Sequence, residues 1–542
     1  MNVYVVFRPS ALALAVAFAM PLAAQTPPDA GRILQDSLPQ SIQPIAPSVD
    51  FTLEAQPLTD AAPGGVSVML NAIRFTDNSV YSEPELMAVL GDVLQKEYDL
   101  AGLRQLANQI SLHYRNTGYP FARAIIPAQN MSEGVLVLQL IEGRYGSVST
   151  SGDARVAADA QPFLSVLEAG AVIESSTLER STLLLGDLPG IRVVPVMRPG
   201  TEIGAGDLNV QVYEDPQFSG SVGVDNHGNR FSGEYRGQTD LRYSRLFTLG
   251  DEVTVRALYT SEDTWLGQLG YVLPLGYSGL RGHVSYAHTD YTLGKSFNGF
   301  YGIAKVSSIG VTYPLIRSQR ANVVLSASYQ YKDLEDSQTM GAYKTANNQS
   351  FPIGLQFDLR DSLAGGGITY GLVQVTPGQI EAKDLLFIGS DDKYSFTKTN
   401  LQIARIQRVN DQFSVFANLN AQYSDKRDLD GSESFSLGGA NGVRAFPVGE
   451  GSDSRGWLAQ FELRYAIDNH LVPYAFYDAG STPRGGVDND RRNLAGAGIG
   501  VRYNRDAFSM DLSSAWEVEG GDANSDDKQR DPRIWITAGY RF

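Results

Sequence analysis

Apolar and polar residues alternate along most of the C-terminal part of the chain. From Asp215 to Phe542 the alternation runs in segments of about ten residues, separated by turns rich in Gly, Asn, Asp and Ser. One such segment has an apolar face and a polar face, formed by Trp457, Ala459, Phe461, Leu463, Tyr465 and Ile467 against Gln460, Glu462 and Arg464. This period of two predicts antiparallel β-strands.

The position of the aromatic residues decides between two folds that share this alternation. A soluble β-sandwich would bury its apolar faces, whereas here aromatic residues crowd the strand ends, as in the girdles of membrane barrels. Roughly 327 residues follow Asp215, and about twenty residues per strand with its turn give about sixteen strands. We therefore predict an all-β transmembrane barrel of about 16 antiparallel strands over residues 215–542.

Residues 66–214 show a different pattern, in which short strands alternate with helices. The order β-α-α-β-β occurs twice, which indicates two related α+β modules at 66–145 and 146–214. The first is predicted from strands at 66–75, 121–126 and 135–142, a helix with its apolar face at 86–94 and a helix at 99–116 that Gly118 ends. The second is predicted from strands at 146–149, 193–197 and 208–212 and helices at 162–167 and 176–185.

The N-terminal region reads as a signal followed by a linker. Arg8 precedes the apolar run Ala11 to Ala24, so residues 1–24 are predicted to be a cleaved secretory signal. Prolines are frequent in residues 25–65, around one short helix predicted at 29–38 with Ile33, Leu34 and Leu38 on its apolar side. Two interpretations of this helix stay open: a plug that occupies the pore, or an unstructured part of the linker.

Composition excludes several classes of function. The chain has no cysteine, which rules out disulfides and thiolate chemistry, and its formal charge of −16 argues against a nucleic-acid partner. The five histidines are scattered, without a metal-ligand or nucleophile-base spacing. We predict no catalytic site, no metal and no cofactor, so the chain is not expected to be an enzyme.

Several short motifs resemble those of a known family. Both modules are similar to POTRA modules, on the residues Gly118-Tyr119-Pro120, 126–129, 134–136, Glu142-Gly143 and 184–190. The segment 224–233 resembles that family's barrel opening, and the last strand, 533–542 with Tyr540 and terminal Phe542, resembles the C-terminal assembly signal of bacterial outer-membrane barrels. Together they resemble the two-partner secretion transporters of the TpsB class, which includes haemolysin activators and filamentous-haemagglutinin secretors.

The resemblance also points to a candidate site inside the barrel. Val443-Arg444-Ala445-Phe446 resembles the Val-Arg-Gly-Tyr/Phe tip of a loop that folds back into the barrel, although Ala445 stands where the family usually has glycine. Phe476, Asp478 and Gly480 match the Phe-x-Asp-x-Gly strand motif, whose aspartate pairs with the loop arginine. The alternatives are a solvated loop cation for Arg444 and a lumen-facing polar group for Asp478.

Function and partners follow from this resemblance as expectations. They are an outer-membrane pore of a Gram-negative bacterium, with periplasmic POTRA modules that recognise an unfolded TpsA-type exoprotein, in contact with outer-membrane lipids and, during biogenesis, the barrel assembly machinery. The POTRA edge strands would bind this exoprotein by β-augmentation, or the modules would be passive spacers. An assembly or insertion factor for other barrels, or a porin, is the alternative function. The exoprotein itself, whether adhesin, cytolysin, contact-dependent toxin or haem-acquisition protein, is not indicated.

Overall fold

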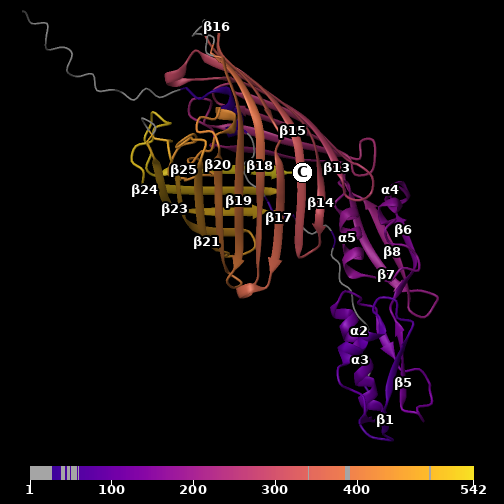
Figure 1. Cartoon of the computed structure of the whole chain (residues 1–542). Coiled ribbons are helices and arrows are strands. Elements are labelled where there is room, and N and C mark those ends of the chain that lie inside the picture. The colour runs from indigo at the N-terminus through magenta and orange to yellow at the C-terminus, as the bar shows by residue number, and fades with distance from the viewer. Residues whose placement is uncertain are drawn as a thin grey trace, which may run out of the picture.

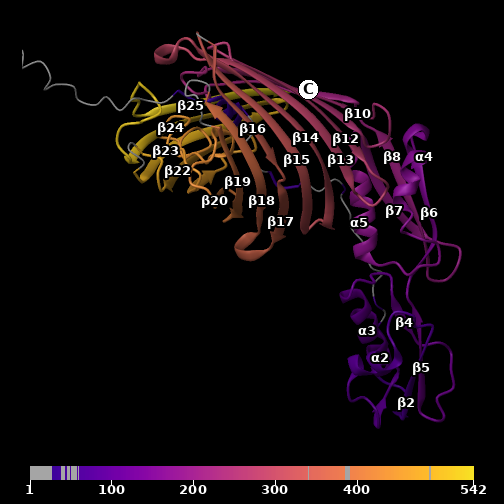
Figure 2. The ribbon, with the colours of Figure 1, turned by 45° about the horizontal axis from the view of Figure 1, so that its top comes forward.

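The computed structural model describes residues 27–37, 43–45, 49, 58, 60–339, 341–384, 391–486 and 490–542. The predicted signal at 1–24 and residue Leu38 of the predicted plug helix lie outside the described residues. Two small modules extend from one end of a β-barrel (Figures 1 and 2). No helix in the described ranges is long and apolar enough to cross a membrane.

The first module packs two helices on a three-stranded sheet of order β2-β5-β4, with β2 parallel to β5. Its elements are β1 Val68–Leu70, β2 Ala72–Thr76, α2 Glu83–Leu90, β3 Lys96–Tyr98, α3 Leu100–Asn116, β4 Arg123–Ile125 and β5 Val135–Ile141. The prediction of one strand over 66–75 was wrong: Leu70 pairs with β3, and two residues later Ala72 pairs with β5. The helix α2 stops at Gly91, whose positive φ of 73° ends it before the last predicted apolar positions.

The second module repeats this plan with a sheet of order β6-β8-β7. Its elements are β6 Arg144–Gly152, α4 Ala154–Ala160, the 3₁₀ turn η1 Gln161–Leu164, α5 Ser175–Gly186, β7 Ile191–Pro199 and β8 Ala205–Glu214. The helix predicted at 162–167 was misplaced, because the helical segment begins at Ala154 and Pro162 lies in the 3₁₀ turn that follows it. The buried face of α4 consists of small residues, which gave a weak apolar pattern.

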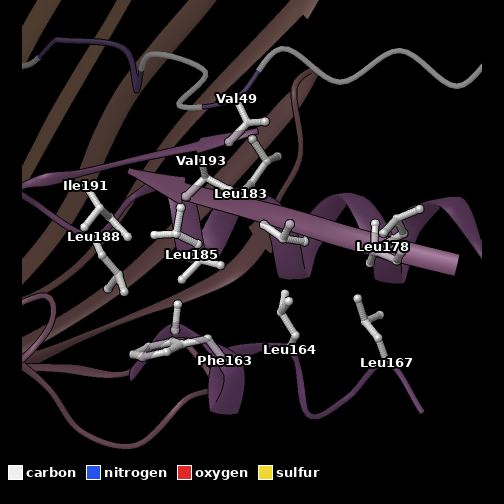
Figure 3. Close-up of a cluster of buried hydrophobic side chains, with 14 of the residues drawn as sticks. Val49, Phe163, Leu164, Leu167, Leu178, Leu183, Leu185, Leu188, Ile191 and Val193 are labelled. Atoms are coloured by element: carbon white, nitrogen blue, oxygen red, sulfur yellow. The ribbon is translucent and has the colours of Figure 1, made fainter. Parts of the chain in front are cut away.

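The core of the second module includes two residues from other parts of the chain. Its buried cluster contains Leu178, Leu183 and Leu185 of α5, together with Val49 of the N-terminal linker (Figure 3). Leu249 of a barrel turn belongs to the same cluster. Val49 is 4% exposed. At the same junction the Arg317 guanidinium donates to Asp187 at 2.6 and 2.7 Å. The second module is thus fastened to turns at one end of the barrel and to the linker.

The barrel is closed and antiparallel. Its segments are β9 Phe218–Asp225, β10 Arg236–Ser244, β11 Glu252–Thr260, β12 Trp265–Pro274, β13 Arg281–Thr292, β14 Phe300–Arg317, β15 Ala321–Gln338, β16 Gly341–Ser350, β17 Ile353–Asp361, β18 Gly367–Asp384, β19 Asp391–Arg408, β20 Phe413–Ser424, β21 Gly456–Tyr465, β22 Leu471–Thr482, β23 Arg492–Arg505, β24 Phe508–Glu519 and β25 Arg533–Arg541. Segments β16 and β17 both pair with β15 and with β18, so they form one strand interrupted at Phe351-Pro352, and the seventeen segments make sixteen strands. The predicted sixteen-stranded barrel behind two α+β modules is confirmed.

The two faces of each strand have opposite character. On β21, Trp457, Phe461 and Leu463 are between 43 and 47% exposed on the outside, while Glu462 is buried in the lumen. The barrel closes between its first and last strands, where β9 and β25 are in register over residues 221–225 and 537–541. The amide side chain of Asn226 extends this short ladder, since it accepts from the backbone of Ile536 and donates to that of Ile534.

Candidate functional site in the barrel lumen

The segment between β20 and β21, residues 425–455, folds back into the barrel and carries Arg444 at its tip. Arg444 is 5% exposed. Its Nε and Nη2 atoms donate to the two carboxylate oxygens of Asp478 at 2.8 and 2.7 Å, and its Nη1 donates to Glu462 at 2.8 Å. The ring of Phe476 lies under the guanidinium, with 3.6 Å from its centroid to Cζ. A planar fork between two carboxylates and an aromatic face suits arginine and no other side chain.

Each residue of the Phe-x-Asp-x-Gly motif on β22 has its own contact with this loop. Phe476 stacks on the guanidinium and Asp478 accepts from it, and Asp478 also accepts from the backbone N–H of Arg444 at 3.1 Å. Gly480 lets the loop approach the wall: a Cβ there would lie 2.7 Å from the side chain of Leu437 and 2.8 Å from the carbonyl oxygen of Trp457. The motif is therefore a seat for the loop tip, assembled at alternate positions of one strand.

The alanine at position 445 is accommodated by a glycine in the wall. A Cβ on Gly496 of β23 would lie 2.6 Å from the Cβ of Ala445, so the bare backbone of Gly496 provides the space that Ala445 fills. Ala445 does not have a positive φ, and its methyl group therefore causes no backbone strain. The neighbouring Val443 and Phe446 are buried against the barrel wall. The effect of alanine in place of the family's usual glycine, which the sequence left open, is thus a packing contact with the wall.

The charge state of Arg444 follows from these contacts. Burial alone would lower the pKa of its guanidinium, but the hydrogen bonds to Asp478 and Glu462 outweigh burial and raise that pKa above its usual value. The tip backbone is held as well: the indole Nε1 of Trp535, on the closing strand β25, donates to the carbonyl oxygen of Arg444 at 2.7 Å. Gln460 donates to the carbonyl oxygen of Gly442 at 2.9 Å.

Two further attachments of the loop have no recognisable motif in the sequence. At its base, the buried carboxylate of Glu433 accepts from Lys332 at 2.5 Å and from Asn348 at 2.6 Å and forms an ion pair with Lys398 at 2.6 Å. Burial would raise the pKa of Glu433, but the two lysines lower it to about 2. Beyond the tip, Glu450 accepts from Arg492 and from the backbone N–H groups of 524 and 525. None of these pairs has a local motif, so only three-dimensional proximity identifies them.

The helix α1, Ala30–Ser37, lies in the lumen beside this loop. Ile33 and Leu34 are buried among apolar residues of the barrel and of its loops: Phe231, Tyr291, Leu293, Ala304, Leu334 and Ala346. The backbone N–H of Ala30 donates to Asp336 at 2.7 Å, and Asp29 pairs with Lys344 at 3.0 Å. Lys344 also pairs with Asp430 of the loop at 3.4 Å, so one lysine of the wall holds both the helix and the loop.

Space remains beside the helix and the loop. A cavity of about 610 Å³ lies between α1, the loop and the wall, and its lining is polar, with Asp36, Arg236, Asp240, Arg256 and Lys398 among its residues. No group of three or more histidine, cysteine, aspartate or glutamate side chains within the described part of the chain could hold a metal ion. What the site offers is a set of hydrogen-bonded and ionic contacts that can be broken and remade.

The predicted assembly signal lies at the barrel closure. Tyr540 faces outward and is register partner to Val222, and the backbone of Phe542 exchanges hydrogen bonds of 2.9 Å with Gly220. In the modules, sheet edges are formed by β2 and β4 in the first and by β6 and β7 in the second. The structure thus brings the loop motif and the β22 motif together and places the C-terminal aromatic residues apart from them.

Comparisons with known proteins agree with this architecture. The family described as haemolysin secretion/activation protein ShlB/FhaC/HecB matches residues 204–503, and the POTRA domain, ShlB-type, matches residues 68–143. The heme/hemopexin transporter protein HuxB of Haemophilus influenzae is 25% identical over 97% of both chains. The outer membrane transporter CdiB of Dickeya dadantii is 22% identical over 85% of this chain and 84% of its own.

Solved structures show the same fold. CdiB from Escherichia coli superposes with a TM-score of 0.74 at 20% identity, covering 90% of this chain and 93% of that one. CdiB from Acinetobacter baumannii gives 0.65 at 17% identity, covering 94% and 96%. The likeness therefore extends over the modules and the barrel together.

Proposed function

The chain belongs to the family of haemolysin secretion/activation proteins ShlB/FhaC/HecB, and from this membership we propose how its pore is gated. It is a two-partner secretion transporter in the outer membrane of a Gram-negative bacterium, with its POTRA modules in the periplasm, and it secretes a TpsA-type exoprotein. Helix α1 and the loop 425–455 occupy the lumen and close it. Secretion requires that both move away from the wall.

The observation that carries this proposal is the kind of contact that holds the two elements. The guanidinium of Arg444, the carboxylate of Glu433 and the carboxylate of Asp29 each bind side chains of the wall. Such contacts can be exchanged for water or for another chain, whereas the apolar contacts of Ile33, Leu34, Val443 and Phe446 stabilise the closed state. The wall itself is a complete hydrogen-bonded barrel, so it stays intact when the plug and the loop leave.

The proposed partners follow from the surfaces. The edge strands of the modules offer unpaired backbone groups to an extended exoprotein, which binds by β-augmentation without a strict sequence requirement. The exposed apolar faces of the strands contact lipid, and the barrel assembly machinery recognises the C-terminal strand ending in Phe542. The chain acts as a conduit without a catalytic step, and folding of the exoprotein outside gives the direction.

A paired proteomic comparison tests this function. Culture supernatant, cell surface and outer membrane are compared between cells with and without the gene. Loss of one large surface or secreted protein, with other barrels unchanged, is the expected result and names the exoprotein. Broad depletion of outer-membrane barrels would instead make the chain an assembly factor, and no change in any protein would leave only a porin.

A further inference from the structure

A set of hydrogen-bond donors on the barrel wall surrounds the carboxylate of Glu433. Lys332 of β15 and Lys398 of β19 each bind one of its oxygens, and the amide of Asn348 on β16 donates to the first of them. Gln422 of β20 donates to the backbone carbonyl of the same residue at 2.8 Å. We call Lys332, Lys398 and Asn348 the carboxylate cradle.

Among the described residues, the side chains of the cradle bind the loop and not the wall. The hydrogen bonds and ion pairs of Lys332 and Lys398 go to Ser432 and Glu433 of the loop. In the closed pore Lys332 is 8% exposed and Lys398 is 9% exposed. When the loop leaves, their two ammonium groups face the lumen together, without a carboxylate between them. Two like charges so placed attract an anion strongly, and the low dielectric of the barrel wall increases the attraction.

A third lysine, Lys344, lies on the wall beyond the cradle. Lys344 is on the same strand as Asn348, four residues away, which corresponds to about 13 Å along the strand. It now binds Asp29, immediately before the helix, and Asp430 of the loop, and its register partner Asp336 stays in the wall. In an extended polypeptide, side chains four residues apart lie on one face at the same spacing of about 13 Å. The spacing between Lys344 and Asn348 on the wall therefore matches that between side chains four residues apart in an extended chain.

We propose that the carboxylate cradle, with Lys344 beyond it, is a binding track for acidic side chains of the exoprotein during its passage. The inference rests on the proposed withdrawal of α1 and the loop. In the closed pore the carboxylates of Glu433, Asp29 and Asp430 occupy the positions that aspartate and glutamate side chains of the exoprotein take over in the open pore. Each exchange replaces one carboxylate by another, so the lysines are never left unpaired for long.

Access to the cradle is visible in the closed pore. The cavity of about 610 Å³ beside the helix has Lys398 and Gln422 in its lining. A second cavity of about 310 Å³ is lined by Lys332, Lys398 and Glu433. Both lysines of the cradle therefore border space inside the closed pore.

The test uses the full chain in detergent and fluorescent hexaglutamate as the probe, followed by anisotropy. Glu433→Ala removes the carboxylate from the cradle and is expected to bind the peptide about tenfold more tightly than Glu433→Ala with Lys332→Met and Lys398→Met, as two ion pairs of modest strength allow. The matched control carries Glu433→Ala with Lys305→Met and Lys393→Met. These two lysines form their ion pairs on the face of the barrel wall that points away from the lumen. It should bind like Glu433→Ala alone.

Equal binding by the two cradle variants would overturn the inference, as would equal affinity for hexalysine. If the methionine variants do not assemble, judged by heat-modifiable gel mobility, Lys332→Gln and Lys398→Gln replace them. The test does not require a moving plug. In planar bilayers, a failure of the Glu433→Ala chain to conduct more current than the unmodified chain would count against the proposed gating and leave the binding result standing.

Discussion

Replacing Arg444 with alanine should release the loop tip from the barrel wall. The substitution leaves Asp478, which is fully buried, with the backbone N–H of residue 444 as its remaining hydrogen-bond donor, while Glu462 keeps Arg464 and Arg502. Breaking a buried pair by removing one partner costs about 3–5 kcal/mol. At about 1.4 kcal/mol per factor of ten, the docked fraction relative to the undocked fraction falls by about 10² to 10³.

Thiol labelling measures this change, because the chain has no cysteine of its own. A cysteine at Ala445, which packs against Gly496, is protected when the tip is docked. In the Arg444→Ala background its reaction with a maleimide should accelerate by a similar factor. Arg484→Ala is the control, since Arg484 pairs with the largely exposed Asp428 and its loss should change the rate little. Equal rates in the Arg444→Ala and unmodified backgrounds, with the barrel assembled, would refute the reasoning.

Three further substitutions test other contacts. Gly480→Ala places a methyl group against Leu437 and should loosen the loop by about 1–3 kcal/mol, read by the same labelling. Leu34→Asp puts a carboxylate into the apolar seat of α1 and should raise the conductance of single pores in planar bilayers, whereas an unchanged conductance would exclude α1 as the plug. In the first module burial would raise the pKa of Glu142, but hydrogen bonds from Ser79 and Val80 lower that pKa below its usual value. Glu142 therefore stabilises the module above about pH 4 and ceases to do so as the pH falls through its folded pKa. Glu142→Gln should lower the hydrogen-exchange protection of residues 72–141 at pH 7. It should also reduce the further loss of that protection as the solution is acidified.

The sequence predicted the fold because its main signal is periodic. Alternation on β21 identifies a strand, an exterior and a lumen at once, and repetition of that pattern gives the barrel. Element ends were less predictable: α4 has a buried face of alanine and valine, and the strand beginning at Val68 changes sheets at Asn71. Neither event leaves a periodic trace in the sequence.

The candidate site divides in the same way. Arg444 and Asp478 lie in short motifs, and the structure places them in contact. Glu462 was visible only as a polar position on an alternating strand, and Glu433 has its partners about 35 and 100 residues away. Gly496 could not be matched to Ala445 from the sequence, because the pairing depends on the depth to which the loop enters the barrel.

Val49 is buried in the second module and anchors the chain that follows helix α1, so under the proposed gating the helix remains tethered when it leaves the lumen. Residues 38–48 connect the helix to that anchor, and fully extended they reach about 40 Å. A helix that leaves the lumen therefore stays near its mouth, at an effective concentration in the millimolar range. In the proposed cycle, closure after each exoprotein has passed is then an intramolecular step, whose rate is set by the length of this connection and not by the abundance of the protein in the membrane.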